Sequence, residues 1–321
     1  MRRREVIAVL GAAAWSGAIW AQPAERVHRL GALLPAAQVA RSFREATVPE
    51  LAKLGFVEGR NLVIDARLVP SDKMPVVAAE LVRSNPDAIL AVGGEAIAAS
   101  IAASDTIPVV MYGADALLRD QDLPLSRSRG NATGFAILGP ELDIKRLEIL
   151  REAVPMAARI GVLLQPSTPN IEGRMRDLAA AARDQRFEPI FIQAAGSGDY
   201  PAAFAAFRAA GVAALLIASH PQFNTDAGEL AAMSLAAGLP TMCHWPEMAA
   251  SGCLLAYGPS RVALFRRSAE YIARILAGTS PRDLPIERPA QVELCYNLRT
   301  SRALGLQLPT TLLARADEVI E

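Results

Sequence analysis

Polar, acidic and aromatic side chains recur in the loops that follow apolar, strand-like runs of this 321-residue chain. Amide N–H groups at the starts of helices attract carboxylates, acidic side chains pair with ammonium groups, and aromatic rings cover apolar groups. Such loops suit a small zwitterion. The candidate ligand-binding residues are Gln38, Gly93, Gly94, Glu95, Ala96, Tyr112 and Asp115 in the first half of the chain, and Gln165, Thr168, Asn170, Ser219, Phe223, Trp245 and Glu247 in the second.

The stretch 86–104 shows how such a loop is built. A buried strand is predicted over 88–92, followed by Gly93-Gly94 and by an Ala/Ile-rich helix from Glu95. In doubly wound sheets, ligands bind just beyond the carboxyl ends of the strands. A glycine pair there lets the backbone approach a ligand, although a purely structural strand-to-helix turn has the same sequence.

Catalytic signatures are not recognisable in the sequence. It contains no G-x-S-x-G elbow, P-loop or H-E-x-x-H motif. Of its three histidines, His28 lies in a strand-like run and is expected to be structural, whereas His220 and His244 each follow a strand and leave room for a catalytic base. We expect a binding protein, without a cofactor, rather than an enzyme.

Three cysteines, Cys243, Cys253 and Cys295, all lie in apolar runs. This setting favours buried, inert thiols, with a Cys243–Cys253 disulfide as the alternative. No two Cys or His residues have the spacing of metal ligands, so no metal site is expected. The chain carries 33 basic and 33 acidic residues without a basic stripe, so nucleic acid is not an expected partner.

The N-terminus has the pattern of an export signal. Met1–Arg4 is basic, Val6–Ile19 is apolar, and cleavage is expected near Ala21. Arg3-Arg4 is compatible with a twin-arginine signal or with an ordinary secretory signal. The sequence therefore predicts a signal peptide over 1–21 and a periplasmic location.

Strands of five to seven residues alternate with helices of ten to fifteen residues in two successive sets, which predicts an α/β fold with parallel sheets. The expected N-terminal lobe comprises 27–118 plus about 258–300, the connector 119–134, and the C-terminal lobe 135–256. We expect a C-terminal tail over 301–321. The late elements are expected to pack back on the first lobe.

Several segments together resemble the ABC-transporter substrate-binding proteins of the tryptophan/tyrosine-type group, over essentially the whole chain. They are Met1–Glu5, Leu54–Asn61, Gly130–Gly134, Lys145–Glu148, Trp245 with Glu247, Tyr257–Pro259, Asn297-Leu298 and Leu313–Ile320. The resemblance implies a periplasmic binding protein of type I fold, with two Rossmann-like lobes joined by crossover hinges. It further implies delivery of a small ligand, such as an amino acid or a related carboxylate, to an ABC permease in the inner membrane.

Carried over by position, Gly93–Ala96, Asp115, Asn170, Trp245 and Glu247 fall where the family lines its cleft. Glu95-Ala96 departs from the small Thr-Pro-like pair common in the family. If it points into the cleft, Glu95 repels a ligand carboxylate and attracts a cation. We expect a monomer. A ligand-sensing module for a membrane receptor and an exported enzyme on the same fold remain alternatives.

Overall fold

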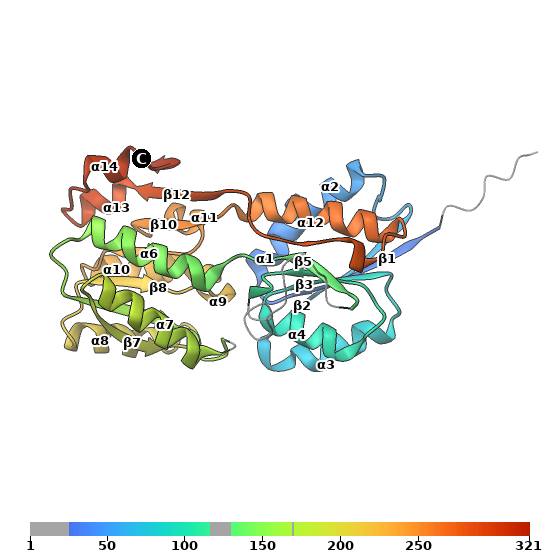
Figure 1. Cartoon of the computed structure of the whole chain (residues 1–321), viewed down its shortest axis with the longest axis horizontal. Coiled ribbons are helices and arrows are strands. Elements are labelled where there is room, and N and C mark those ends of the chain that lie inside the picture. Colours follow the sequence, from blue (N-terminus) through green and yellow to red (C-terminus); the bar gives the residue numbers. More distant parts are fainter. Residues whose placement is uncertain (1–25, 116–129, 169) are drawn as a thin grey trace, which may run out of the picture.

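The computed structural model describes residues 26–115, 130–168 and 170–321. Two α/β lobes lie side by side along the long axis of the molecule, each built around its own sheet (Figure 1). The expected signal peptide, and most of the expected connector, lie outside the described residues. The two lobes match the fold class predicted from the alternating strand and helix patterns.

The sheet of the first lobe has the strand order β11-β5-β4-β3-β1-β2, with all neighbours parallel. Its strands are β1 (His28–Leu34), β2 (Leu62–Leu68), β3 (Ala88–Val92), β4 (Val109–Tyr112), β5 (Ala132–Phe135) and β11 (Ile286–Glu287). All five residues of β3 are buried, because helices cover both faces of the sheet. Leu90 and Val92 pack into one hydrophobic cluster, and Ile89 and Ala91 into another.

The helices of this lobe form a layer on each face of the sheet (Figure 1). On one face α12 packs against β3, β4 and β5, and against the first helical segment of the chain; α3 and α4 pair on the other face. These elements are α1 (Ala37–Ser42), a π-helical turn (Phe43–Thr47), α2 (Val48–Lys53), α3 (Met74–Arg83), α4 (Gly94–Ala103) and α12 (Arg261–Leu276).

The sheet of the second lobe has the order β13-β12-β10-β9-β8-β6-β7. Its strands are β6 (Arg159–Leu164), β7 (Glu188–Gln193), β8 (Ala214–Ile217), β9 (Thr241–Cys243), β10 (Leu255–Pro259), β12 (Val292–Asn297) and β13 (Glu318–Ile320). Only the β10–β12 pair is antiparallel among the paired strands of the described chain. The helices are α6 (Gly139–Ala153), α7 (Ile171–Asp184), α8 (Tyr200–Ala209), α9 (Pro221–Thr225), α10 (Ala227–Ala236), α11 (Pro246–Ala250), α13 (Leu298–Ala303) and α14 (Thr310–Leu313).

Strand pairing corrects the expected assignment of the late elements. The range 258–300 is divided: α12 and β11 join the first lobe, whereas β12 pairs with β10 in the second sheet. The tail does not pack back on the first lobe either, because β13 pairs with β12 and α14 contacts α6. A local sequence pattern identifies a strand but not its partner, since pairing depends on contacts distant in sequence.

The expected connector also contains a strand. β5 pairs with β4 and brings Gly134 beside Met111. A Cβ atom at Gly134 would lie 2.1 Å from the Met111 carbonyl oxygen, so only glycine fits here. The polar, glycine-rich sequence around β5 therefore reflects close backbone packing rather than a loop.

The described chain passes between the lobes three times: between β5 and α6, between β10 and α12, and between β11 and β12 (Figure 1). At the first passage Leu138 adopts a left-handed conformation, with φ of 55°. Such a conformation is unfavourable for a branched residue unless surrounding contacts enforce it. The three passages are the natural hinge of the molecule.

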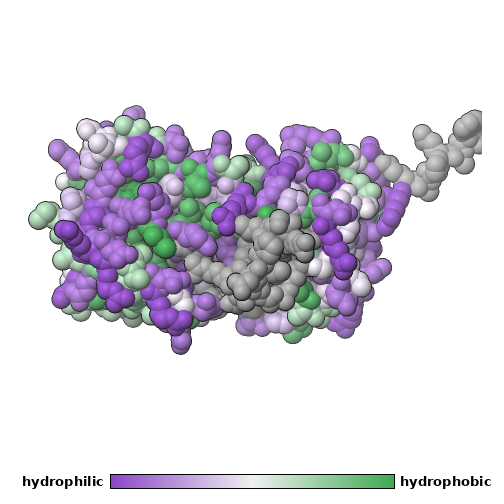
Figure 2. Space-filling model, viewed as in Figure 1, coloured by the Kyte–Doolittle hydropathy of each residue, from purple (hydrophilic) through white to green (hydrophobic). Residues whose placement is uncertain are grey.

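Hydrophilic side chains cover most of the described surface on the face shown in Figure 2. Among residues 26–115, 130–168 and 170–321, no helix combines the length and apolar character needed to cross a bilayer.

Candidate ligand cavity between the lobes

A cavity of about 130 Å³ lies where the carboxyl ends of the two sheets face each other. One ordered water needs roughly 10–15 Å³, so the space suits a small organic molecule. Both lobes line it. The first lobe contributes Val39, Val92, Gly93, Gly94, Glu95, Tyr112, Gly113, Asp115, Arg261 and Phe265. The first passage and the second lobe contribute Ile137, Gly139, Thr168, Asn170, Arg174, Ser219, His220, Pro221, Asn224 and Trp245. Doubly wound sheets place ligands at this edge.

Gly93 directly follows β3 and faces Pro221 of the second lobe. Its φ of 88° is a conformation that favours glycine, and its N–H donates to the Tyr112 carbonyl at 2.9 Å. A Cβ atom here would lie 3.7 Å from the Pro221 side chain. The glycine therefore allows α4 to begin directly beneath the opposite lobe.

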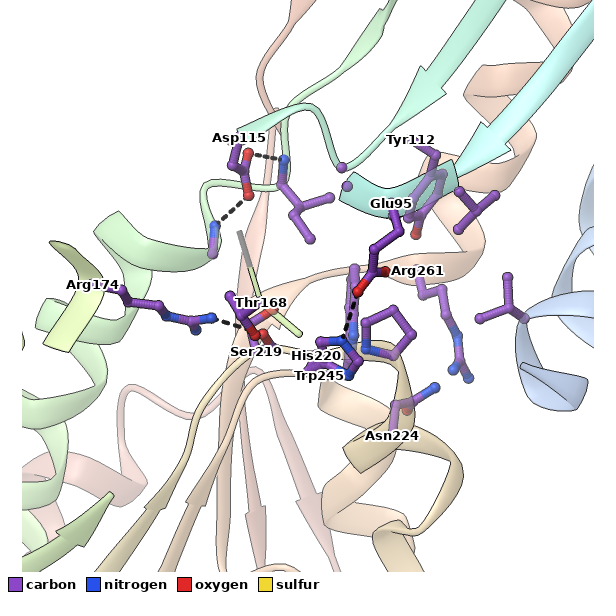
Figure 3. Close-up of a pocket in the computed structure, with 18 of the residues that line it drawn as sticks. Glu95, Tyr112, Asp115, Thr168, Arg174, Ser219, His220, Asn224, Trp245 and Arg261 are labelled. Carbon is purple, nitrogen blue, oxygen red and sulfur yellow. Dashed lines mark hydrogen bonds and ion pairs between the residues drawn. The ribbon is translucent and has the colours of Figure 1, made fainter. Parts of the chain in front are cut away.

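Glu95 contacts the second lobe across the cavity (Figure 3). Its carboxylate accepts a 2.7 Å hydrogen bond from Ser167 Oγ and lies 3.8 Å from His220 Nε2. Burial alone would raise the pKa of Glu95, but the interactions with His220 and Ser167 outweigh it and lower the pKa. Glu95 does point into the cleft, as the sequence allowed, but it meets protein partners there.

Asp115 fastens the first passage between the lobes. Its Oδ1 accepts hydrogen bonds from the backbone N–H groups of Ile137 and Leu138, and its Oδ2 from that of Gly139, all at 2.8 Å. Burial raises the pKa of Asp115 although these bonds oppose the shift. These hydrogen bonds stabilise the left-handed conformation of Leu138, and they use both oxygens of the Asp115 carboxylate.

A buried ionic cluster supports the second wall of the cavity. Asp143 accepts hydrogen bonds from Arg146 Nη1 at 2.6 Å and from both Nε and Nη2 of Arg174. Arg174 also donates to the Ser219 carbonyl at 3.0 Å, and Arg146 donates to the His244 carbonyl at 3.2 Å. Because each charge has a partner, the cluster can hold the loops after β8 and β9 in fixed positions.

Aromatic rings make one side of the cavity apolar. Tyr112 stacks on Phe265 with ring centroids 4.6 Å apart, and the Trp245 ring lies 6.5 Å from Tyr112. The Tyr112 hydroxyl is buried and finds no hydrogen-bond partner in residues 26–115, 130–168 and 170–321. Burial raises the pKa of Tyr112 well above its ordinary value, with smaller effects from Arg261 and Glu247, so this hydroxyl remains protonated.

Arg261 is a cavity residue that the sequence analysis missed. It is the first residue of α12, and its side chain is only 7% exposed. Its Nε lies 3.6 Å from Glu247 Oε1, and its Nε and Nη1 atoms have no hydrogen-bond partner among the described residues. A cation is electrostatically unfavourable at a helix N-terminus, so its occurrence at this point was the signal that could have revealed it.

A protein-family model described as ABC transporter substrate binding protein matches residues 44–320. The chain belongs to this family. The tyrosine-binding protein of Clostridioides difficile (strain R20291) is 24% identical over 272 residues, which cover 82% of this chain and 76% of that protein.

Two solved structures share the fold of this substrate-binding protein. A conserved domain protein from Vibrio cholerae is 21% identical with a TM-score of 0.82, over 91% of this chain and 99% of that one. The ABC domain in complex with L-Trp from Streptococcus pneumonia is 16% identical with a TM-score of 0.79, over 91% of this chain and all of that one. The periplasmic binding protein type I fold expected from the resemblance is thereby confirmed.

Most of the residues predicted to bind a ligand do line the cavity of the substrate-binding protein. They are Gly93, Gly94, Glu95, Tyr112, Asp115, Thr168, Asn170, Ser219 and Trp245. Asn170 takes part through the left-handed turn, with φ of 52°, that starts α7. The common signal was a polar or glycine residue directly after a strand, which the parallel topology brings to one edge.

The other five predicted residues do not line the cavity. Gln38 lies on α1 outside the lining set, Ala96 is a fully buried residue of α4, and Phe223 packs beside Tyr200 in the core. Gln165 Oε1 accepts a 2.5 Å hydrogen bond from the backbone N–H of Ser167. Glu247 faces Arg261. Four of these five residues lie on helices, where only one face points toward the cavity, so a position close to a strand end does not fix which side chains face the ligand.

His244 also turns away from the cavity lining. It is buried, and burial followed by the nearby Arg146 charge lowers its pKa well below the ordinary value. His28 packs edge-on against Phe56, at 5.2 Å, in the first strand. His220 is thus the histidine among the described residues that reaches the cavity.

The cysteine prediction was wrong for two of the three residues. Cys243 and Cys253 form a disulfide, and Cys295 is a buried free thiol. The bridge joins the end of β9 to the start of the segment before β10 and encloses the loop that carries Trp245 and Glu247. Apolar surroundings suggested inert thiols, but they equally suit a buried disulfide once two strands bring the cysteines together.

Proposed function

We propose that this family member captures a small organic ligand in the interlobe cavity and delivers it to an ABC permease in the inner membrane. The observation that carries the proposal is the composition of the cavity wall, to which both lobes contribute. A ligand enclosed by both lobes can enter and leave only if the lobes separate, which is the hinge motion of binding proteins.

The geometry supports a closed state stabilised by contacts across the cavity. Ser167 donates to Glu95, and Pro221 approaches Gly93. Asp115 and Arg261 lie next to two of the three passages between lobes, so a ligand in the cavity would contact the hinge itself. Ligand binding would thereby be coupled to the lobe closure that a permease recognises.

The tyrosine-binding protein and the L-Trp complex motivate amino acids as the first compounds to test. An exported, periplasmic location agrees with this role, and the proposed signal peptide over 1–21 would provide it. We further propose that the protein acts by binding alone, without a catalytic step.

A thermal-shift screen of the purified protein against amino acids, short carboxylates and amines tests the proposal. A ligand at 100 times its dissociation constant adds about 2.7 kcal/mol to the free energy of unfolding. Because one kcal/mol raises Tm by roughly 2–4 °C for a chain of somewhat smaller size, the expected shift is several degrees. If no compound changes Tm, the binding role is wrong. When the screen identifies a ligand, uptake of that ligand in labelled form should be lost in a strain that lacks the gene.

A further inference from the structure

We infer that the ligand presents a carboxylate to Arg261 and Tyr112, and that it needs no amino group to bind. The inference rests on the proposed function, since it takes the cavity to be the ligand site. It replaces the zwitterion expected from the sequence with a carboxylic acid that has an apolar body.

Arg261 provides the first part of the argument. Its guanidinium is buried, lines the cavity and leaves Nε and Nη1 without hydrogen bonds. The single acidic neighbour that an ion pair records, Glu247, lies at 3.6 Å from Nε, beyond ordinary hydrogen-bond distance. A buried guanidinium with free donors is costly, and a carboxylate can accept from two of its N–H groups at once.

Other unpartnered polar atoms in the lining can also donate. Within the described part of the chain, Tyr112 Oη and Thr168 Oγ1 are both buried without a hydrogen-bond partner, and so is His220 Nε2, which lies 3.8 Å from Glu95. Figure 3 shows Arg261, Tyr112 and His220 on one side of the cavity and Asp115 and Arg174 on the other. Unused donors around a cavity require acceptors on the ligand.

The two carboxylates of the lining, which are the counter-charges that an ammonium group would need, already have partners within the protein. Asp115 accepts three backbone N–H groups, and Glu95 accepts from Ser167 and faces His220. These two are the acidic residues in the described lining of the cavity. An α-ammonium would compete with these partners for the carboxylates, whereas a carboxylate on the ligand would satisfy donors that have no partner in the described chain.

The remaining lining defines the body of the ligand. Val39, Val92, Ile137, Phe265 and Trp245 present apolar surface. A flat aromatic or branched aliphatic group would pack against these side chains and contribute affinity by burying apolar surface. The ligand class is therefore an aryl- or branched alkyl-substituted monocarboxylate.

Isothermal titration of two matched sets of compounds tests the inference. The first set is 3-phenylpropanoate, L-phenylalanine and 2-phenylethylamine, and the second is 4-methylpentanoate, L-leucine and 3-methylbutylamine. We expect a carboxylate without an amino group to bind in at least one set, at least as tightly as its amino acid, and the matching amine not to bind. Binding of an amino acid or amine without the corresponding carboxylate would overturn the inference but leave the proposed function intact. No binding by any of the six would also overturn the inference, whereas the proposed function would be refuted only if the thermal-shift screen found no ligand either.

A substitution identifies the residue responsible. Arg261→Gln should weaken binding of the carboxylate on the order of 100-fold, which is the typical effect of removing one partner of a buried charge pair. It should leave the neutral amide, 3-phenylpropanamide or 4-methylpentanamide, nearly unaffected, so the preference for carboxylate over amide disappears. Arg266→Gln, an exposed arginine on the same helix, is the control. An unchanged preference in Arg261→Gln would assign the carboxylate to another group, whereas equal weakening of acid and amide would indicate structural damage; either result rejects this role for Arg261.

Discussion

The Ser167 hydroxyl donates a 2.7 Å hydrogen bond to the Glu95 carboxylate across the cavity. Glu95 lies in the first turn of α4, and Ser167 follows β6, so the bond joins the two lobes. Separation of the lobes breaks it. Glu95 therefore stabilises the closed arrangement of the lobes. This role explains why a carboxylate lies beside a cavity whose other unpartnered groups are hydrogen-bond donors.

Glu95→Ala should shift the ligand-free protein toward an open state. Loss of the bond is expected to cost about 1 kcal/mol, or about fivefold in the ratio of closed to open molecules, because both groups are partly exposed. Small-angle scattering should show a larger radius of gyration. Ser167→Ala should act in the same way, and the double variant should add little. An equal change in Glu172→Ala, a surface carboxylate on α7, would contradict this role.

The closing contact should also depend on pH. The pKa of Glu95 is lowered from its ordinary value of 4.5, so its contribution is complete above about pH 4.5 and is lost as pH falls through the lowered value. Thermal unfolding from pH 7 to pH 3 should show the Tm difference between the parent protein and Glu95→Ala disappearing at the acid end. Both proteins should retain His220, because its interaction with Glu95 is the largest of those that lower the pKa of this carboxylate. A constant difference would refute the linkage.

Reduction should destabilise the wall that carries Trp245. The Cys243–Cys253 bridge closes a loop with a sequence separation of 10, for which chain entropy predicts a contribution of about 3 kcal/mol. Urea unfolding with and without dithiothreitol measures this loss, and Trp fluorescence reports on the loop. Cys295→Ala should retain the full response to the reductant. If Cys253→Ala responds to dithiothreitol as the parent does, the bridge is not the cause.

Asp143→Asn should be strongly destabilising. Asp143 is the shared acceptor of Arg146 and Arg174, and its removal leaves two buried guanidinium groups without their counter-charge. Breaking such a buried ion pair costs about 3–5 kcal/mol. Urea denaturation provides the measurement, and Asp177→Asn on the neighbouring helix α7 gives a matched control. A loss below about 1 kcal/mol would show that the cluster does not support the wall.

The sequence revealed the strands best where they are buried on both faces. Runs such as Ala88–Val92 and Arg159–Leu164 are continuous and apolar, because helices cover them on both sides. The short strand β5 lies largely within the sequence predicted as a connector, because Gly134 marks close packing there and not a turn. Strand partners were also unpredictable, as β12 shows, because pairing is decided by contacts between distant segments.

The position of the cavity could be predicted in outline from the parallel strands. Residues that directly follow parallel strands, such as Gly93 and Ser219, are brought to one edge by topology alone. Arg261 follows β10 by a single residue but reaches the cavity from the other lobe, because the chain crosses between lobes at that point. The position of such a residue depends on the hinge path, which local patterns do not contain.

The three passages between the lobes also bear on how the molecule is made. Helix α12 covers the first sheet and β12 extends the second, so each lobe contains an element that lies in the last fifth of the polypeptide. A ribosome that has finished α11 has produced neither lobe in complete form. The nascent chain cannot fold one lobe and then the other in order; the two must be finished together, late and through contacts between distant segments, which makes folding slow.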